Sequence, residues 1–170
     1  MTEHHHHHAH DAGDPSSLRV AVITVTDTRS IADDEGGAIA AELVVKAGHS
    51  VVRREILRDD VEAIGASVRG ACDAGVELVI LTGGTGIAPR DVTYEAIEGL
   101  LEKKLDGFGE AFRARSWPQV GPRAMLSRAL AGTRGRALVV ALPGSPRGVR
   151  LAMEELLLPF AAHAVGLLRG

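Results

Sequence analysis

Residues 76–86 read VELVILTGGTG, an apolar run that passes directly into a glycine-rich turn. The apolar part is typical of a strand buried on both faces of a parallel sheet. Three glycines within residues 83–86 let the backbone adopt positive φ angles and bring several N–H groups onto one anion. Arg90 and Asp91 follow closely, and Arg90 adds a fixed positive charge. The stretch therefore predicts a strand followed by a phosphate site.

The upstream sequence predicts alternating strands and helices. The predicted elements are a strand at 18–26, a helix at 38–47, a strand at 50–57 and a helix at 61–74. Together with the strand at 76–81 this order indicates right-handed crossovers and an α/β fold, a doubly wound, mostly parallel sheet with helices on both faces in three layers. Ligands of such folds bind beyond the carboxyl ends of the strands. Thr26, Asp27 and Asp59 are thus expected on the same rim as the glycine turn.

The downstream sequence predicts a second turn at the same rim. The predicted elements are a helix at 92–103, a turn at 107–110 leading into another helix, a buried strand at 136–142 and a closing helix at 147–166 interrupted near Pro159. Residues 124–128 fit a helix or a strand. The strand at 136–142 ends in Pro143-Gly144-Ser145, which we expect to lie beside the glycine turn.

Composition bounds the class of protein. The 170 residues are 45% hydrophobic and 3% aromatic, which fits one domain at 18–170 with an aliphatic core. A net charge of −3 disfavours nucleic acid as a partner. Cys72 is the only cysteine, and no apolar run approaches the length of a membrane helix, so a soluble protein of the cytoplasm is expected. The histidine-rich residues 1–17 read as a disordered tail, possibly a purification tag.

The acidic residues have competing interpretations. A carboxylate beside a phosphate needs a cation between them, and Mg²⁺ is the usual one, so Asp91 is a candidate metal ligand. Thr93 could cap the next helix and leave Asp91 facing the rim. Asp59, followed by Glu62, reads on sequence alone as a helix N-cap. Residues 33–35 (Asp-Asp-Glu) read as a solvated acidic loop. Walker and dinucleotide motifs are both absent after Gly86.

Taken together, the motifs resemble those of the MoaB/Mog family of molybdenum cofactor biosynthesis proteins. The resemblance spans residues 18–170 and rests on the segments 82–86, 90–93, 107–110, 126–128 and 142–146. Residues 26–29 and 113–121 look closer to the MoaB branch. The resemblance implies a molybdopterin-binding domain that assembles as a homotrimer or homohexamer in the cytoplasm. It also implies transient contacts with other proteins of molybdenum cofactor biosynthesis.

The resemblance also implies an activity, transfer of AMP from Mg-ATP to the terminal phosphate of molybdopterin with release of pyrophosphate. Asp59 and Asp91 match the two functionally important aspartates and would act through Mg²⁺, which replaces the cap interpretation of Asp59. The implied substrate-binding residues are Thr26, Asp27, Thr82, Gly83, Gly84, Thr85, Gly86, Arg90, Ser127, Pro143, Gly144 and Ser145.

Three departures from the family pattern stand out. Tyr94 replaces the usual proline, Gly36 replaces a hydroxyl residue and Thr26 replaces a serine. Two other functions fit parts of the pattern. One is a non-catalytic pterin- or nucleotide-binding scaffold of the same family, and the other, from strand order alone, is a flavodoxin-like FMN carrier.

Overall fold

The computed structural model describes residues 17–170, so the predicted tail lies outside the described residues except for Ser17. The strands are β1 (Arg19–Val25), β2 (Ser50–Leu57), β3 (Leu78–Thr82), β4 (Lys103–Lys104), β5 (Leu130–Arg134) and β6 (Ala137–Leu142). The helices are η1 (Ile31–Asp33), α1 (Glu35–Lys46), α2 (Val61–Asp73), α3 (Thr93–Glu98), α4 (Asp106–Val120), η2 (Gly121–Leu126), α5 (Pro146–Leu151), η3 (Ala152–Leu157) and α6 (Leu158–Arg169).

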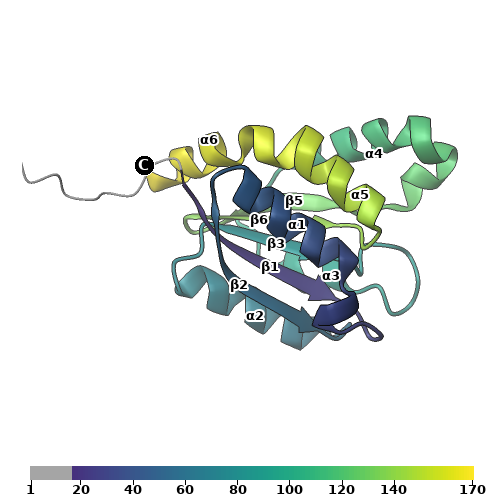
Figure 1. The fold of residues 1–170 in the computed structure, drawn as a ribbon, viewed down its shortest axis with the longest axis horizontal. Helices are drawn as coiled ribbons and strands as arrows, with labels where there is room; N and C mark the ends of the chain where they lie inside the picture. Colours follow the sequence, from purple (N-terminus) through teal and green to yellow (C-terminus); the bar gives the residue numbers. More distant parts are fainter. Residues whose placement is uncertain (1–16) are drawn as a thin grey trace, which may run out of the picture.

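The six strands form one sheet in the order β2-β1-β3-β6-β5-β4. The first four are parallel, and β5 and β4 continue the sheet antiparallel. Figure 1 shows α1, α5 and α6 on one face and α2 on the other. The predicted three-layer, doubly wound and mostly parallel α/β fold is confirmed.

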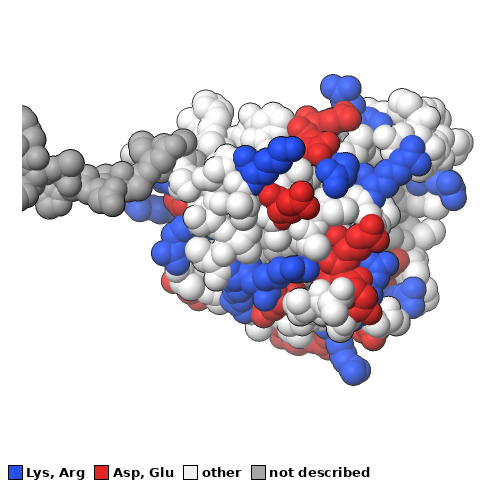
Figure 2. Space-filling model, viewed as in Figure 1, with Lys and Arg blue, Asp and Glu red and all other residues white. Residues whose placement is uncertain are grey.

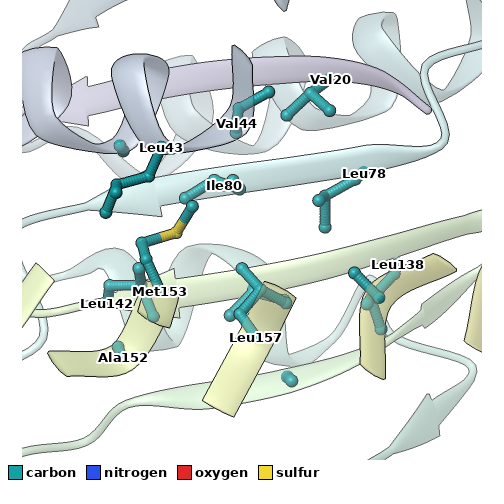
Figure 3. Close-up of a cluster of buried hydrophobic side chains, with 14 of the residues drawn as sticks. Val20, Leu43, Val44, Leu78, Ile80, Leu138, Leu142, Ala152, Met153 and Leu157 are labelled. Atoms are coloured by element: carbon teal, nitrogen blue, oxygen red, sulfur yellow. The ribbon is translucent and has the colours of Figure 1, made fainter. Parts of the chain in front are cut away.

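Alternate residues of the central strands enter two separate cores. Val20 and Val22 of β1 join the cluster beneath α1 and the closing helix, whereas Ala21 and Ile23 join the cluster beneath α2 and α3. Figure 3 shows the first cluster, in which Met153 extends toward Ile80 of β3. Burial on both faces explains why these strands read as continuous aliphatic runs.

Two predictions for the second half of the chain are wrong, and one strand was not predicted. The helix expected at 92–103 ends at Glu98, because Lys103 and Lys104 pair with β5 as strand β4. The expected turn at 107–110 is the first turn of α4. Gly109 of this turn serves close packing, since a Cβ there would lie 2.6 Å from the carbonyl oxygen of Ala129. Strand β5 was not predicted, and residues 124–128 are the end of η2 followed by extended chain.

Residues 146–169 form a continuous helix with one irregularity. The segment η3 is a π-helix that ends at Leu157, shortly before Pro159. Proline has no N–H to donate to the carbonyl of Glu155, the residue one helical turn earlier. By length and hydropathy this helix could cross a membrane, contrary to the sequence expectation. Val149, Met153 and Leu157 are nevertheless fully buried against the sheet, as in the core helix of a globular domain.

Candidate functional site

The carboxyl ends of four parallel strands meet at one rim. Val25 of β1 pairs with Leu57 of β2, and Thr82 of β3 pairs with Thr24 of β1 and Leu142 of β6. β1 and β3 flank the point where strand order reverses, which is where ligands bind in such folds. A cavity of about 190 Å³ lies there. Its lining residues are Thr24, Val25, Thr26, Asp27, Thr28, Arg29, Asp59, Thr82, Gly83, Gly84, Arg90, Asp91 and Gly144.

The glycine turn needs glycine at two positions. Gly83 and Gly84 have φ angles of 93° and 69°. A Cβ at Gly83 would lie 2.4 Å from the Val25 carbonyl oxygen, and one at Gly84 would lie 2.2 Å from Oγ1 of Thr93. That hydroxyl donates to the Gly83 carbonyl at 2.8 Å, so Thr93 fastens the turn. The prediction that Thr93 caps α3 is wrong, because Thr93 is its first residue and Val92 is the N-cap.

Three N–H groups of the turn are not used by the fold. Within residues 17–170, the N–H groups of Gly84, Thr85 and Gly86 have no hydrogen-bond acceptor, although the carbonyls of Gly83 and Gly84 are both used. Thr85 is itself buried, and neither Thr85 nor Gly86 lines the cavity. Successive N–H donors on a glycine backbone suit an anion such as phosphate.

Asp59 is free for the cavity because its neighbour caps the helix. The carboxylate of Asp60 accepts from the N–H of Ala63 at 2.7 Å and caps α2. Asp59 lines the cavity, and its N–H donates to the carboxylate of Asp27 at 3.1 Å. The sequence-only interpretation of Asp59 as the cap is therefore wrong.

Asp91 is partly committed to the turn. Its Oδ2 accepts from the N–H of Ala88 at 2.9 Å, and its N–H donates to the Ala88 carbonyl at 2.9 Å. The same oxygen lies 2.6 Å from where a Cβ of Gly86 would be, so that glycine makes room for the carboxylate. Asp91 still lines the cavity, and its other carboxylate oxygen, Oδ1, has no hydrogen-bond partner within residues 17–170.

The electrostatics of the cavity favour a cation. Burial raises the pKa of the Asp59 carboxyl, and the charges of Asp27 and Asp91 raise it further, while Arg90 opposes them. Among residues 17–170, no group of three or more metal-ligating side chains is arranged to hold an ion by itself. The donors fit Mg²⁺, which characteristically takes one or two carboxylates and completes its shell with water and substrate phosphate.

A buried hydrogen-bond chain supports the floor of the cavity. The Thr82 hydroxyl bonds that of Thr24 at 3.2 Å, and Thr24 donates to Oδ2 of Asp34 at 2.6 Å. Asp34 also caps α1 through the N–H of Gly37 and pairs with Arg54 at 3.3 Å. With 2% exposure, Asp34 is not part of a solvated loop, and that prediction is wrong for this residue.

Of the remaining predicted residues, Gly144 lines this cavity and the others lie beside it. A Cβ at Gly144 would lie 3.3 Å from the Cα of Gly83, so the two turns are packed closely together. Ser127, Pro143 and Ser145 line a neighbouring cavity of about 320 Å³. The Ser145 hydroxyl accepts from the N–H of Gly148 at 3.2 Å and caps α5, so it is already in use.

Sequence reasoning missed two contributions. Thr24 and Arg29 line the cavity from the end of β1 and the loop after it. Arg128 does not line it but donates to the carbonyl of Gly86, the last residue of the glycine turn, and to that of Asp91 beyond it. The segment 126–128 was noted as a motif, and the arginine in it was the available signal.

Charge elsewhere on the surface is mixed. Figure 2 shows lysines and arginines interspersed with acidic residues over α1 and β2, without a continuous basic face on that side. The rim cavity is likewise lined by both signs of charge, with Arg29 and Arg90 beside the carboxylates of Asp27, Asp59 and Asp91.

Comparison with known proteins identifies the family. Residues 21–163 match the family described as "Probable molybdopterin binding domain". Molybdenum cofactor biosynthesis protein B of Bacillus cereus is 46% identical over 151 residues, or 88% of this chain and 89% of that protein. A crystal structure of a molybdenum cofactor biosynthesis protein B, 43% identical, has a TM-score of 0.88 over 92% of this chain and 99% of its own. The Mog protein of Mycobacterium ulcerans is 32% identical, with a TM-score of 0.82 over 89% and 99% of the two chains. The chain therefore belongs to the MoaB/Mog family of molybdenum cofactor biosynthesis proteins.

Proposed function

We propose that this protein acts in molybdenum cofactor biosynthesis by transferring AMP from Mg-ATP to the terminal phosphate of molybdopterin. A phosphate oxygen of molybdopterin attacks the α-phosphorus of ATP, the bond from that phosphorus to the β-phosphate breaks, and pyrophosphate leaves. The observation that carries the proposal is the convergence of Asp27, Asp59, Asp91 and Arg90 with the glycine turn around one cavity.

The chain's own groups would align the two substrates and balance their charge. The N–H groups of Gly84, Thr85 and Gly86 would donate to phosphate oxygens, and Arg90 would offset the charge that develops on the departing pyrophosphate. No covalent enzyme intermediate is needed, because the molybdopterin phosphate is already a competent nucleophile. Thr26, Asp27 and Thr82 would contact the substrates at the ends of β1 and β3.

Asp59 and Asp91 would hold Mg²⁺ together with substrate phosphate. Bound there, Mg²⁺ would supply Lewis-acid neutralisation of phosphate charge. The raised pKa of Asp59 reflects burial and the nearby charges of Asp27 and Asp91, which Arg90 only partly offsets, and this fits a cation arriving with the nucleotide. Ser127, Pro143 and Ser145 would contact the pterin end from the neighbouring cavity, and Gly144 would contact it from the rim cavity.

The test is pyrophosphate release from ATP and molybdopterin in the presence of Mg²⁺. We expect Asp59→Asn and Asp91→Asn each to lower the rate by about 100-fold or more, on the scale of losing one electrostatic group in an active site. Asp60→Asn is the matched control, because asparagine also caps a helix, and it should keep wild-type activity. An Asp91→Asn variant with full activity contradicts the assigned role.

A non-catalytic scaffold of the same family is the competing function. It predicts that wild-type protein binds molybdopterin or nucleotide in calorimetry yet releases no pyrophosphate, whereas the enzyme predicts both. A purified protein that carries bound FMN would favour the flavodoxin-like alternative. Whether the protein is the enzyme or the scaffold, we propose that it is cytoplasmic and assembles as a homotrimer or homohexamer. Sedimentation measures the number of subunits directly.

A further inference from the structure

The loop that carries Arg90 and Asp91 has few internal contacts. Between β3 and α3, residues 83–92 form no helix or strand. The internal bonds that tie its far end are the two between Ala88 and Asp91. Thr93 fastens the near end through Gly83 and Gly84. The middle of the loop, with the N–H groups of Thr85 and Gly86, therefore needs support from elsewhere in the fold.

Arg128 supplies that support from the segment before β5. Its backbone N–H donates to the Thr85 carbonyl at 2.9 Å, and its Nε donates to the Gly86 carbonyl at 2.9 Å. Its Nη2 donates to the Asp91 carbonyl at 3.0 Å. One residue thus ties the glycine turn to the backbone of Asp91.

Two residues of α3 hold Arg128 in place. Glu95 accepts from Nη1 and Nη2 of the guanidinium in a fork geometry that lysine cannot reproduce. The guanidinium also lies over the Tyr94 ring, 5.3 Å from its centroid. Tyr94 is one of the positions at which this chain departs from the family pattern. The departure therefore adds an aromatic contact to the arginine.

We propose that Arg128 is a positioning residue that, clamped by Glu95 and Tyr94, presets the loop 83–91 before any ligand binds. Its effect on catalysis rests on the proposed adenylyl transfer, but its effect on the loop does not. The loop amides that donate hydrogen bonds in the free protein, those of Gly83, Ala88 and Asp91, are therefore protected from solvent exchange to an extent that depends on the guanidinium.

Hydrogen exchange of the protein without nucleotide tests the clamp. We expect Arg128→Ala to speed exchange of the hydrogen-bonded amides of Gly83, Ala88 and Asp91 by about tenfold or more while amides of α2 stay unchanged. Arg128→Lys should not restore protection, because an ammonium cannot bridge Gly86, Asp91 and Glu95 together. Arg115→Ala, which removes a largely exposed arginine paired with Glu155 at 3.7 Å, is the control and should match wild type. Loop protection unchanged in Arg128→Ala overturns the proposal.

Steady-state kinetics separates positioning from simple loss of structure. We expect Arg128→Ala to lower kcat for pyrophosphate release by about tenfold or more with a smaller change in the KM for molybdopterin, because misplaced groups cost most in the transition state. If Arg128→Ala does not fold, Glu95→Gln at the surface weakens the same clamp and should show the same changes at smaller size. A wild-type chain without pyrophosphate release contradicts the proposed function, while the exchange comparison still decides the clamp.

Discussion

At the scale of single residues, the rim concentrates groups that the fold alone does not need. Asp59 sits where burial and two other carboxylates disfavour its charge. Its neighbour Asp60 performs the structural task of capping α2. A charge kept in an unfavourable place beside a residue that does the structural work is characteristic of a site selected for binding rather than for stability.

The raised pKa of Asp59 has a consequence for stability. The folded chain binds this proton more tightly than the unfolded chain, so the contribution to stability is complete below the ordinary pKa and is lost as pH rises through the folded pKa. We expect Asp59→Asn to raise the free energy of unfolding at neutral pH by about 0.5 kcal/mol, the scale for partly exposed charges. Thermal unfolding in metal-free buffer across a pH series measures it. A variant less stable than wild type at neutral pH, or a gain that persists at about pH 3, argues against this reading.

At the scale of elements, the two N-caps at the rim differ in burial. Asp34 caps α1 with 2% exposure and also binds Thr24 and Arg54, whereas Asp60 caps α2 at an exposed position. We expect Asp34→Ala to cost about 2–4 kcal/mol, because it leaves buried polar groups unpaired, and Asp60→Ala only about 1 kcal/mol. Urea unfolding of the two variants compares them. Equal costs would mean that the buried hydrogen bonds from Asp34 through Thr24 to Thr82 add no stability beyond that of the cap.

Elements with a strong periodic pattern were predictable, and those made by pairing were not. Strand β2 was predicted with its observed bounds, and α2 to within one residue, because β-branched runs and glycine stops mark them. Strand β5 reads LAGTR, too short and glycine-containing to signal a strand, and it exists because β6 and β4 pair with it. Gly109 was misread as a turn because close packing and chain reversal use the same residue type.

The candidate site divides in the same way. The glycine turn and the residues that follow each strand were predictable, since parallel strands deliver their carboxyl ends to one rim. The burial of Asp34 and the hydrogen bonds of Arg128 to the loop were not predictable, because both depend on residues that meet only in the folded chain. The assignment of Asp59 came from family resemblance, and the geometry adds a reason, namely that Asp60 is the cap.

At the scale of the whole molecule, one sheet separates two cores that share its strands. Leu157 is fully buried in the cluster beneath the closing helix, and Ile64 is fully buried in the cluster beneath α2. The sheet lies between them, so the two side chains share no direct partner, yet neither layer of helices can leave without exposing the same strands. We therefore expect one cooperative transition for both faces.

Two substitutions on opposite faces test this coupling. We expect Leu157→Ala to cost about 2–5 kcal/mol and Ile64→Val about 0.5–1.5 kcal/mol, through lost burial and the cavity left behind. The double variant should show the sum within about 0.5 kcal/mol in a single transition, because the sites are distant but belong to one folding unit. Urea unfolding at fixed protein concentration, followed by circular dichroism and fluorescence, measures it, with the exposed Leu167→Ala as control. Two separate transitions, or probes that disagree, would mean that the rim joins two independently stable layers, and the positions of Asp59 and Asp91 would then no longer be fixed by one common scaffold.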